Sequence, residues 1–334
     1  MTVVAVLGAG RIGAVHARSI AAAPDAELAL VVDPVPGAAE ALAGAHGARA
    51  AGDAAAAFQD PAIDAVVIGS PTRYHVQHIL EGVAAGKALF VEKPIDLDLA
   101  RADDCIRQVG AARDRVMVGF NRRFDPSTAS LRQRVRDGEI GALEQLSIVS
   151  RDPAPPPAAY LRGSGGIFKD MVIHDFDTAR SLLGEIDSVA VTGQHLDPDV
   201  EDEWDAAAST LVGVGGAVCT IVTSRHCATG YDQRIEAFGP LGSLRLENQV
   251  TDGVRAYTRD SAGATGPFQN FFLERYADAY RIEMDAFLRA VRGDGPMGPG
   301  LLDGRQALAI AEAATEAART GTRVRVQPLP VGAA

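Results

Sequence analysis

The 334-residue sequence has few cysteines and no excess of positive charge. Its three cysteines, Cys105, Cys219 and Cys227, are an odd number, and no two of them have the C-x-x-C spacing of a zinc site. We therefore expect no disulfide framework, no cysteine-based metal site, and reduced thiols of the kind that cytoplasmic proteins carry. Acidic residues outnumber Lys and Arg by 43 to 32, and the resulting net charge of −11 makes nucleic acid an improbable partner.

Long apolar runs are also missing. No run approaches the roughly 18 residues of a membrane span, and no basic segment precedes the strand-like Thr2–Leu7. We therefore expect neither a signal peptide nor a membrane partner, and we expect a cytoplasmic location. The chain is nevertheless 47% hydrophobic, which is enough to bury a core, and its length favours two domains over one.

The first 120 residues alternate short apolar runs with alanine-rich or amphipathic segments. This alternation predicts βαβ units around a parallel sheet that is covered on both faces. The strands are expected at 3–7, 28–32, 65–68, 88–91 and 116–118, and the helices at 12–23, 38–46, 74–85 and 97–112.

The pattern changes after residue 120, where apolar runs follow one another without helices between them. We expect this second domain, 121–334, to hold a largely antiparallel sheet, with a hairpin at Val214-Gly215-Gly216. Its strands are expected at 143–150, 188–192, 207–212, 217–224, 233–238, 243–246 and 323–326, and its helices at 126–137, 169–183, 270–292 and 303–319.

The run Gly8-Ala9-Gly10-Arg11-Ile12-Gly13 is a complete G-x-G-x-x-G between an expected strand and an expected helix. Gly8 permits the tight turn, Gly10 lets a pyrophosphate approach the backbone, and Gly13 lets helix and strand pack closely. Asp33 ends the next strand, where an acid accepts hydrogen bonds from an adenosine ribose and repels a 2′-phosphate. The sequence therefore predicts NAD rather than NADP, although Asp33 also suits a turn or a helix cap.

Two segments carry candidate chemistry. Lys93, in Glu92-Lys93-Pro94, follows a strand at the carboxyl edge of the expected sheet, where ligands bind in such folds. Asp170 and His174 are spaced i, i+4, so we expect them on one face of one helix, where they can hold a hydroxyl group and take its proton. The alternatives are a solvated loop lysine and a solvated helix face.

Taken together, these segments resemble the Gfo/Idh/MocA oxidoreductases. The resemblance rests on runs that follow in order along the chain: the glycine-rich run, 92–94, 119–126, 150–153, 165–177 and Gly230-Tyr231-Asp232. It implies an α/β fold, with an N-terminal Rossmann domain at 1–120 and a C-terminal α/β domain whose open, mostly antiparallel sheet mediates a homo-oligomer, a tetramer or a dimer.

The resemblance also implies roles for individual residues. Lys93, Asp170 and His174 carry over as catalytic residues, and Arg122, Asp152 and Tyr231 as substrate contacts. Some relatives have a histidine near position 150 and an asparagine near 152, whereas this chain has Ser150 and Asp152. The cofactor contacts implied by the glycine-rich run and the resemblance are Gly8, Gly10, Arg11, Ile12, Gly13, Asp33, Ser70, Thr72, His75, Glu92 and Lys93.

The implied activity is the NAD-dependent oxidation of a cyclic polyol, myo-inositol to its 2-keto product, with His174 as general base. Two alternatives stay open. One is a dehydrogenase for another inositol isomer or a pyranose sugar, since polar groups around the ring decide specificity. The other is a non-catalytic NAD-binding protein on the same fold.

Overall fold

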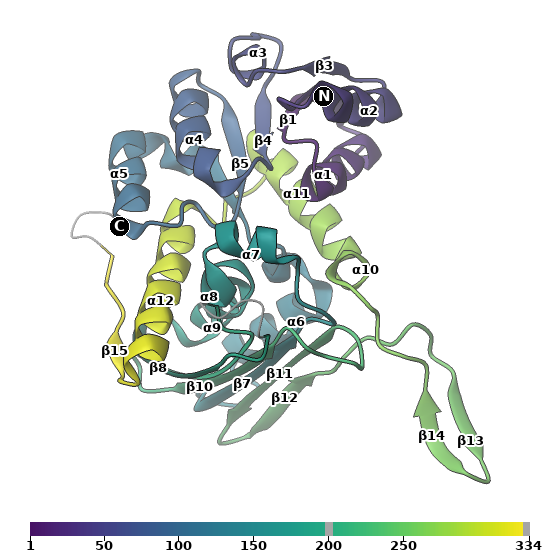
Figure 1. Cartoon of the computed structure of the whole chain (residues 1–334), viewed down its shortest axis with the longest axis vertical. Coiled ribbons are helices and arrows are strands. Elements are labelled where there is room, and N and C mark those ends of the chain that lie inside the picture. The colour runs from purple at the N-terminus through teal and green to yellow at the C-terminus, as the bar shows by residue number, and fades with distance from the viewer. Residues whose placement is uncertain (198–202, 330–334) are drawn as a thin grey trace. The chain divides into compact units, whose positions relative to one another are not determined.

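The structure is a computed structural model that describes residues 1–197 and 203–329. The chain forms two compact units, the first mainly Met1–Phe124 with Ala279–Leu308 and the second Asp125–Asp278 with Ala309–Pro328 (Figure 1). The sequence placed the division at residue 120, so the two divisions differ chiefly over Ala279–Leu308. No helix in the described ranges combines the length and the apolar character that a membrane span needs.

The first unit is built on a six-stranded parallel sheet in the order β3-β2-β1-β4-β5-β6. This is the Rossmann arrangement that the alternating pattern predicted, and the five expected strands lie within about two residues of the observed ones. The strands are β1 (Thr2–Leu7), β2 (Ala26–Val32), β3 (Arg49–Ala51), β4 (Ala65–Ile68), β5 (Ala88–Glu92) and β6 (Val116–Gly119).

Helices cover both faces of this sheet because its strands are apolar on both sides. On one face, α11 packs with α1 and α2, and its Met284, Phe287 and Leu288 join the same buried cluster as Val4 and Phe90. Leu89, which alternates with Phe90, faces α4. The helices of this unit are α1 (Arg11–Ala22), α2 (Pro36–His46), α3 (Ala55–Phe58), α4 (His75–Ala84), α5 (Leu99–Val109), α11 (Ala277–Val291) and the start of α12 (Leu301–Thr320), with short 3-10 turns η1 (Thr72–Tyr74), η2 (Gly110–Arg115) and η3 (Asn121–Phe124).

The second unit holds a seven-stranded mixed sheet in the order β12-β11-β7-β10-β9-β8-β15. All its neighbouring pairs are antiparallel except β7 and β10, and a turn at Gly216 joins β9 to β10 as expected. The strands are β7 (Gln145–Arg151), β8 (Ile186–Gln194), β9 (Ala206–Gly213), β10 (Val218–Ser224), β11 (Asp232–Gly239), β12 (Gly242–Leu246) and β15 (Val324–Arg325).

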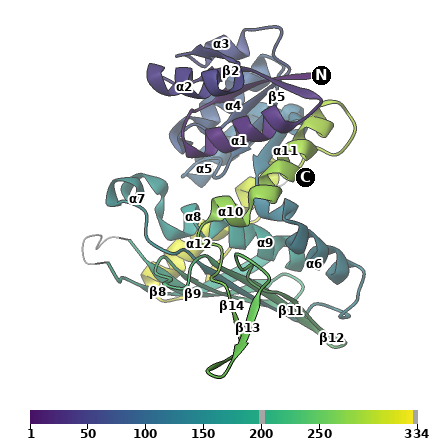
Figure 2. The same ribbon diagram turned by 90° about the vertical axis from the view of Figure 1, so that its right-hand side faces the viewer.

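Helices lie on one face of the seven-stranded sheet, and the other face is open (Figure 2). A separate hairpin, β13 (Arg255–Thr258) and β14 (Ser261–Thr265), extends away from the sheet of its own unit and is almost wholly exposed. Neither this hairpin nor α7 was expected from the sequence. The helices are α6 (Pro126–Arg136), α7 (Ala158–Ser164), α8 (Gly166–Asp170), α9 (Ile173–Leu183), α10 (Phe272–Arg275) and the rest of α12.

The single helix expected at 169–183 is two helices, α8 and α9, separated at Met171 and Val172. The backbone N–H groups of both residues donate to the Ile167 carbonyl, so the regular i→i−4 ladder is interrupted there. The prediction that Asp170 and His174 share one face of one helix is therefore wrong, because Asp170 ends α8 and His174 lies in the first turn of α9.

Candidate functional site

The glycine-rich turn between β1 and α1 fits a dinucleotide. Gly8 has a φ of +98°, which favours glycine, and a Cβ on Gly13 would lie 1.9 Å from the Gly8 carbonyl oxygen. A Cβ on Gly10 would meet nothing within 4 Å, so the space beside this backbone is open. Gly10 caps α1 without any side-chain hydrogen bond, which leaves the first N–H groups of the helix available to a pyrophosphate.

Asp33 follows β2 at the same edge of the sheet and is tied to the glycine-rich turn. Its Oδ2 accepts a hydrogen bond from the Ala9 N–H at 2.8 Å, and its Oδ1 accepts one from the Val35 N–H at 2.8 Å. A carboxylate has about four acceptor positions, so two remain for the hydroxyl groups of a ribose. Asp33 thus combines the turn role that the sequence left open with a geometry suited to NAD.

Ser70, Thr72 and His75 follow β4 and belong to the loop beside the glycine-rich turn. The His75 side chain is buried, with Nδ1 2.8 Å from the Pro94 carbonyl oxygen and Nε2 2.8 Å from the Ser70 carbonyl oxygen. Burial lowers the pKa of His75, so the ring is neutral near pH 7 and donates to one of the two carbonyls. His75 therefore joins the backbone that follows β4 to the backbone that follows β5.

Glu92 and Lys93 end β5, and Lys93-Pro94 is a cis peptide bond. The Oε1 atom of Glu92 lies 2.6 Å from Nε2 of His16, which is fully buried on α1. This contact joins the helix of the glycine-rich turn to the strand that presents Lys93. Lys93 is partly exposed at the carboxyl edge, where the sequence placed it.

In the second unit, two predicted residues, Asp152 and Tyr231, come to one edge of the mixed sheet. Asp152 follows β7, and its N–H donates to the Ser224 carbonyl at the end of β10. Tyr231 immediately precedes β11, and the register pairs Arg151 with Asp232. Tyr231 is 6% exposed and packs at 90° against Tyr276, which holds its ring in place.

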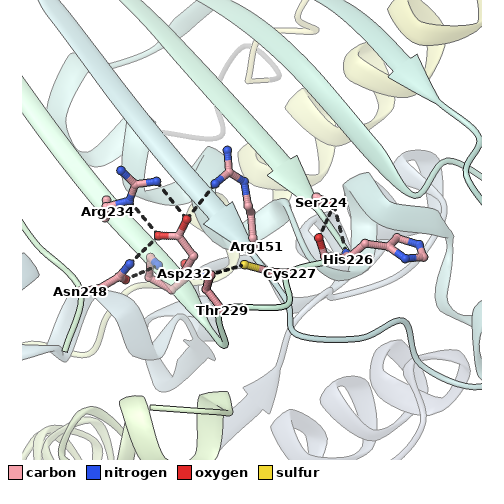
Figure 3. A network of polar contacts seen from close by, with 9 residues as sticks. Arg151, Ser224, His226, Cys227, Thr229, Asp232, Arg234 and Asn248 are labelled. Atoms are coloured by element: carbon pink, nitrogen blue, oxygen red, sulfur yellow. Dashed lines mark hydrogen bonds and ion pairs between the residues drawn. The ribbon is translucent and has the colours of Figure 1, made fainter. Parts of the chain in front are cut away.

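A polar network fixes this edge (Figure 3). Asp232 accepts hydrogen bonds from Arg151 at 2.9 Å, from Arg234 and from Asn248. Burial acts to raise the pKa of Asp232, but the hydrogen bonds from Arg234 and Asn248 outweigh it, and the pKa is lowered. Arg151 is thus engaged by Asp232, and the role of its neighbour Asp152 as a substrate contact stays a prediction.

Asp170 ends α8 in the same unit. Its Oδ1 accepts a hydrogen bond from the Tyr160 hydroxyl at 3.0 Å, and its Oδ2 lies 3.8 Å from Nη2 of Arg225, which follows β10. The Asp170 carboxylate therefore belongs to the β7–β10 edge that also carries Asp152. His174 begins α9, four residues later, and both residues are partly exposed.

Arg122 lies in η3 of the first unit and is 7% exposed. The predicted residues of the first unit thus gather at the carboxyl edge of the parallel sheet, and Asp152, Asp170 and Tyr231 of the second unit gather around the ends of β7 and β10. Among the residues that the structure describes, no group of three His, Cys, Asp or Glu side chains could hold a metal ion.

A cavity of about 680 Å³ in the first unit lies at the opposite, amino end of the strands. Thr2, Lys87, Arg115 and Arg292 are among its lining residues, and Lys87 is occupied by the carbonyls of Asp60 and Ile63. Ligands of open parallel sheets bind at the carboxyl ends, so this cavity is not part of the candidate site.

Sequence reasoning did not find Tyr160, Arg225 or the partners of Asp232. Arg225 follows an apolar strand and stands in no recognisable motif, and Tyr160 lies on the unexpected helix α7. The only signal for the network was Asp232 itself, in the Gly230-Tyr231-Asp232 run. These residues become visible only when the register of β7, β10 and β11 is known.

Comparison with known proteins identifies the family. Residues 2–120 match the model described as "Oxidoreductase family, NAD-binding Rossmann fold", and residues 128–245 match the GFO/IDH/MocA C-terminal domain. The chain is 44% identical over 313 residues to an inositol 2-dehydrogenase of Rhizobium meliloti, covering 92% of this chain and 94% of that one.

Two solved structures are similar over nearly their whole length. A myo-inositol dehydrogenase from Corynebacterium glutamicum superposes with a TM-score of 0.95 at 45% identity, covering 98% of this chain and 99% of that chain. A scyllo-inositol dehydrogenase from Lactobacillus casei, with bound NAD(H) and scyllo-inositol, superposes with a TM-score of 0.90 at 31% identity and the same coverage. Because both family domains are present and the relatives are similar over nearly their whole length, the chain belongs to the Gfo/Idh/MocA family of oxidoreductases, and its first unit is an NAD-binding Rossmann domain.

Proposed function

We propose that this chain oxidises a ring hydroxyl of a cyclic polyol, converting myo-inositol to its 2-keto product. As a family member it is an NAD-dependent oxidoreductase that acts on CH–OH groups. The observation that carries the substrate proposal is the polar edge formed by Asp152, Asp170 and Tyr231, in a chain whose whole length resembles inositol dehydrogenases. Carboxylates and a phenol at one sheet edge suit a ligand with several hydroxyl groups.

NAD, when bound, supplies the hydride acceptor. The residues present fit it, since the open backbone beside Gly10 and the two remaining acceptor positions of Asp33 are what a dinucleotide needs. Around the reacting carbon, His174 takes the hydroxyl proton and Asp170 orients that hydroxyl. Lys93 donates a hydrogen bond to the oxygen as it becomes a ketone, so the charge that develops there is stabilised.

NADH formation at 340 nm tests the activity. The substrates are myo-, scyllo- and D-chiro-inositol, glucose and xylose, each with NAD and with NADP. We expect preferential turnover of myo-inositol with NAD. Turnover of a different inositol or of a pyranose would move the substrate and keep the mechanism. Saturable NAD binding with no turnover of any polyol would replace the proposal by a non-catalytic NAD-binding protein.

The catalytic roles are tested by substitution. His174→Ala should lower kcat by about 10²–10⁴-fold, the usual value of general-base catalysis, while NAD binding survives. An unchanged kcat would remove His174 from the mechanism. Lys93→Met should lower kcat at least as much, and an effect on KM alone would make Lys93 a binding residue.

We also propose that the open face of the seven-stranded sheet joins copies of this chain into a homo-oligomer, a tetramer. Val222 and Phe238 are about 40% exposed on this sheet, and Leu241, in the turn between β11 and β12, is 75% exposed. Apolar side chains of this size support an interface between subunits. Sedimentation should give a tetramer that Val222→Lys with Phe238→Lys dissociates, and a monomeric unsubstituted protein would overturn the proposal. A cytoplasmic location remains a prediction from the reduced, buried thiols.

A further inference from the structure

Arg225 is the largest charged side chain buried in the second unit near the candidate site. It follows β10, its residue is 0% exposed, and its N–H donates to the Asp205 carbonyl. An arginine side chain stays protonated at any pH the protein experiences. A full positive charge is therefore buried directly after the end of β10.

Asp170 is the carboxylate that forms an ion pair with this guanidinium. Its Oδ2 lies 3.8 Å from Nη2 of Arg225, and the structure records no other ion pair for Arg225 within 1–197 and 203–329. Nη1 and Nη2 are fully buried and make no hydrogen bond to any described residue. Because a buried charge without a counter-charge is strongly unfavourable, the Asp170 carboxylate is the group that compensates this guanidinium.

The other charged groups around this pair are engaged elsewhere or carry the same sign as Asp170. Lys169, beside Asp170 in the chain, directs its Nζ to Glu312 at 3.3 Å. His226, beside Arg225, lies 3.9 Å from Oδ1 of the buried Asp205. Glu203 lies against Gly166 at the start of α8, and a Cβ there would approach its Oε2 to 2.7 Å.

Tyr160 completes the arrangement from α7. Its hydroxyl donates to Oδ1 of Asp170, so the two carboxylate oxygens face two different partners, a phenol and a guanidinium. This arrangement restricts rotation of the carboxylate about its last torsion. Tyr160 is 54% exposed, whereas Arg225 is buried. Of the two residues that contact Asp170, Arg225 is therefore the one held in a fixed position.

We infer that Arg225 is a positioning residue for the oxidation: its buried guanidinium holds the Asp170 carboxylate in the orientation in which it meets the reacting hydroxyl. This inference rests on the proposed function, in which Asp170 orients that hydroxyl. Arg225 itself need not touch the substrate. The signature of such a residue is a loss in kcat that depends on Asp170, with the NAD-binding site of the first unit unaffected.

The test compares Arg225→Met, Arg225→Lys and Asp170→Asn in steady-state kinetics with myo-inositol or whichever polyol the panel identifies. Arg305→Lys is the matched control, because Arg305 is equally buried and pairs with Asp103 at 2.8 Å in the first unit, outside the candidate site. Arg225→Met should lower kcat by about 10- to 100-fold with the KM for NAD unchanged. Arg225→Lys, which keeps the charge, should recover part of that loss, and Arg305→Lys should leave kcat within about twofold.

Two further measurements separate positioning from a general loss of structure. The loss in Arg225→Met should lie in kcat and leave the KM for NAD unchanged. In the Asp170→Asn background, Arg225→Met should cause little further loss in kcat, since the partner is already gone. If Arg225→Met does not fold, the partial loss in Arg225→Lys and its coupling to Asp170→Asn decide the question.

The outcomes distinguish a failure of this inference from a failure of the proposed function. If Asp170→Asn is impaired but the Arg225 variants keep the unsubstituted kcat, this inference is overturned and the proposed function stands. If Asp170→Asn is fully active, the proposed role of Asp170 fails first. Equal and additive losses in Arg225→Met and Asp170→Asn would also overturn the inference, since independent effects show no coupling.

Discussion

Asp33 offers the sharpest test of cofactor choice. Both of its oxygens already accept a backbone N–H at 2.8 Å, from Ala9 and from Val35, and the remaining acceptor positions face the edge where a ribose would bind. A hydrogen bond to a charged group contributes about 1.5–3 kcal/mol. Asp33→Ala should therefore raise the KM for NAD by roughly 10- to 150-fold for one lost ribose contact, at about tenfold per 1.4 kcal/mol.

The effect on NADP should have the opposite sign. Removing the carboxylate removes its repulsion of a 2′-phosphate, so kcat/KM for NADP should stay constant or rise and the preference for NAD should fall. The assay is initial-rate NADH or NADPH formation at 340 nm over a range of each cofactor. Because salt screens exposed charges, the remaining preference should also weaken as ionic strength rises.

Asp33→Ala also removes two backbone hydrogen bonds, so a control for stability is needed. Asp64 provides it, since its Oδ2 accepts the Val3 N–H at 2.8 Å at the amino end of the same sheet. Asp64→Ala should lower the free energy of unfolding by about 1 kcal/mol and leave both cofactor constants unchanged. The reasoning is refuted if Asp33→Ala keeps the KM for NAD within twofold, or if both variants change it equally.

Three further predictions concern the core and the titrating groups. Phe287→Ala, at a fully buried position against Phe90, should lower the free energy of unfolding by about 3–5 kcal/mol in chemical denaturation, whereas Tyr257→Ala at a 72% exposed position should lower it by under about 1 kcal/mol; equal losses would contradict the placement of α11 in the first core. Burial raises the pKa of Cys105 to about 12, so mass mapping should find this thiol unmodified by an alkylating reagent at pH 8 until denaturant is added. Burial lowers the pKa of His75 from 6.5, so the folded state binds this proton less readily than the unfolded chain; stability should be complete above about pH 6.5 and fall below it, and an equally steep fall in His75→Gln would refute the assignment.

The first unit was largely predictable because its signals are local. A buried parallel strand reads as an apolar run, and the glycine pattern identifies the first turn whatever the rest of the chain does. The strand β3 (Arg49–Ala51) was not predicted because three residues at a sheet edge, two exposed and one half-buried, carry no periodic signal. NAD was inferred from Asp33, and the family comparison agrees with an NAD-binding domain.

The second unit was less predictable because its decisive features depend on tertiary context. A continuous helix fitted the apolar spacing of 169–183, yet the helix is interrupted at Met171, where the N–H groups of two residues donate to the Ile167 carbonyl. The hairpin β13–β14 has mostly exposed residues and no buried face, so no alternation marks it. The proximity of Arg225 to Asp170 joins positions 55 residues apart, and only the packing of α8 against the end of β10 brings them together.

The same distinction explains the placement of α11. Met284, Phe287 and Leu288 give a clear helical stripe, which predicts that the helix has a buried face. The stripe does not identify the surface that covers it. The surface that covers the stripe is the sheet formed by the first 120 residues, which are distant from the helix in the sequence.

This placement has a consequence for how the protein is made. A ribosome releases the amino-terminal strands first, but the residues that complete their core, Met284 and Phe287, emerge only after every strand of the second sheet except β15. Until then one apolar face of the nascent Rossmann sheet is covered only in part, by α1 and α2. The growing chain therefore cannot mature one unit at a time from its amino end, and competence to bind NAD should appear late in synthesis, when the last helices arrive.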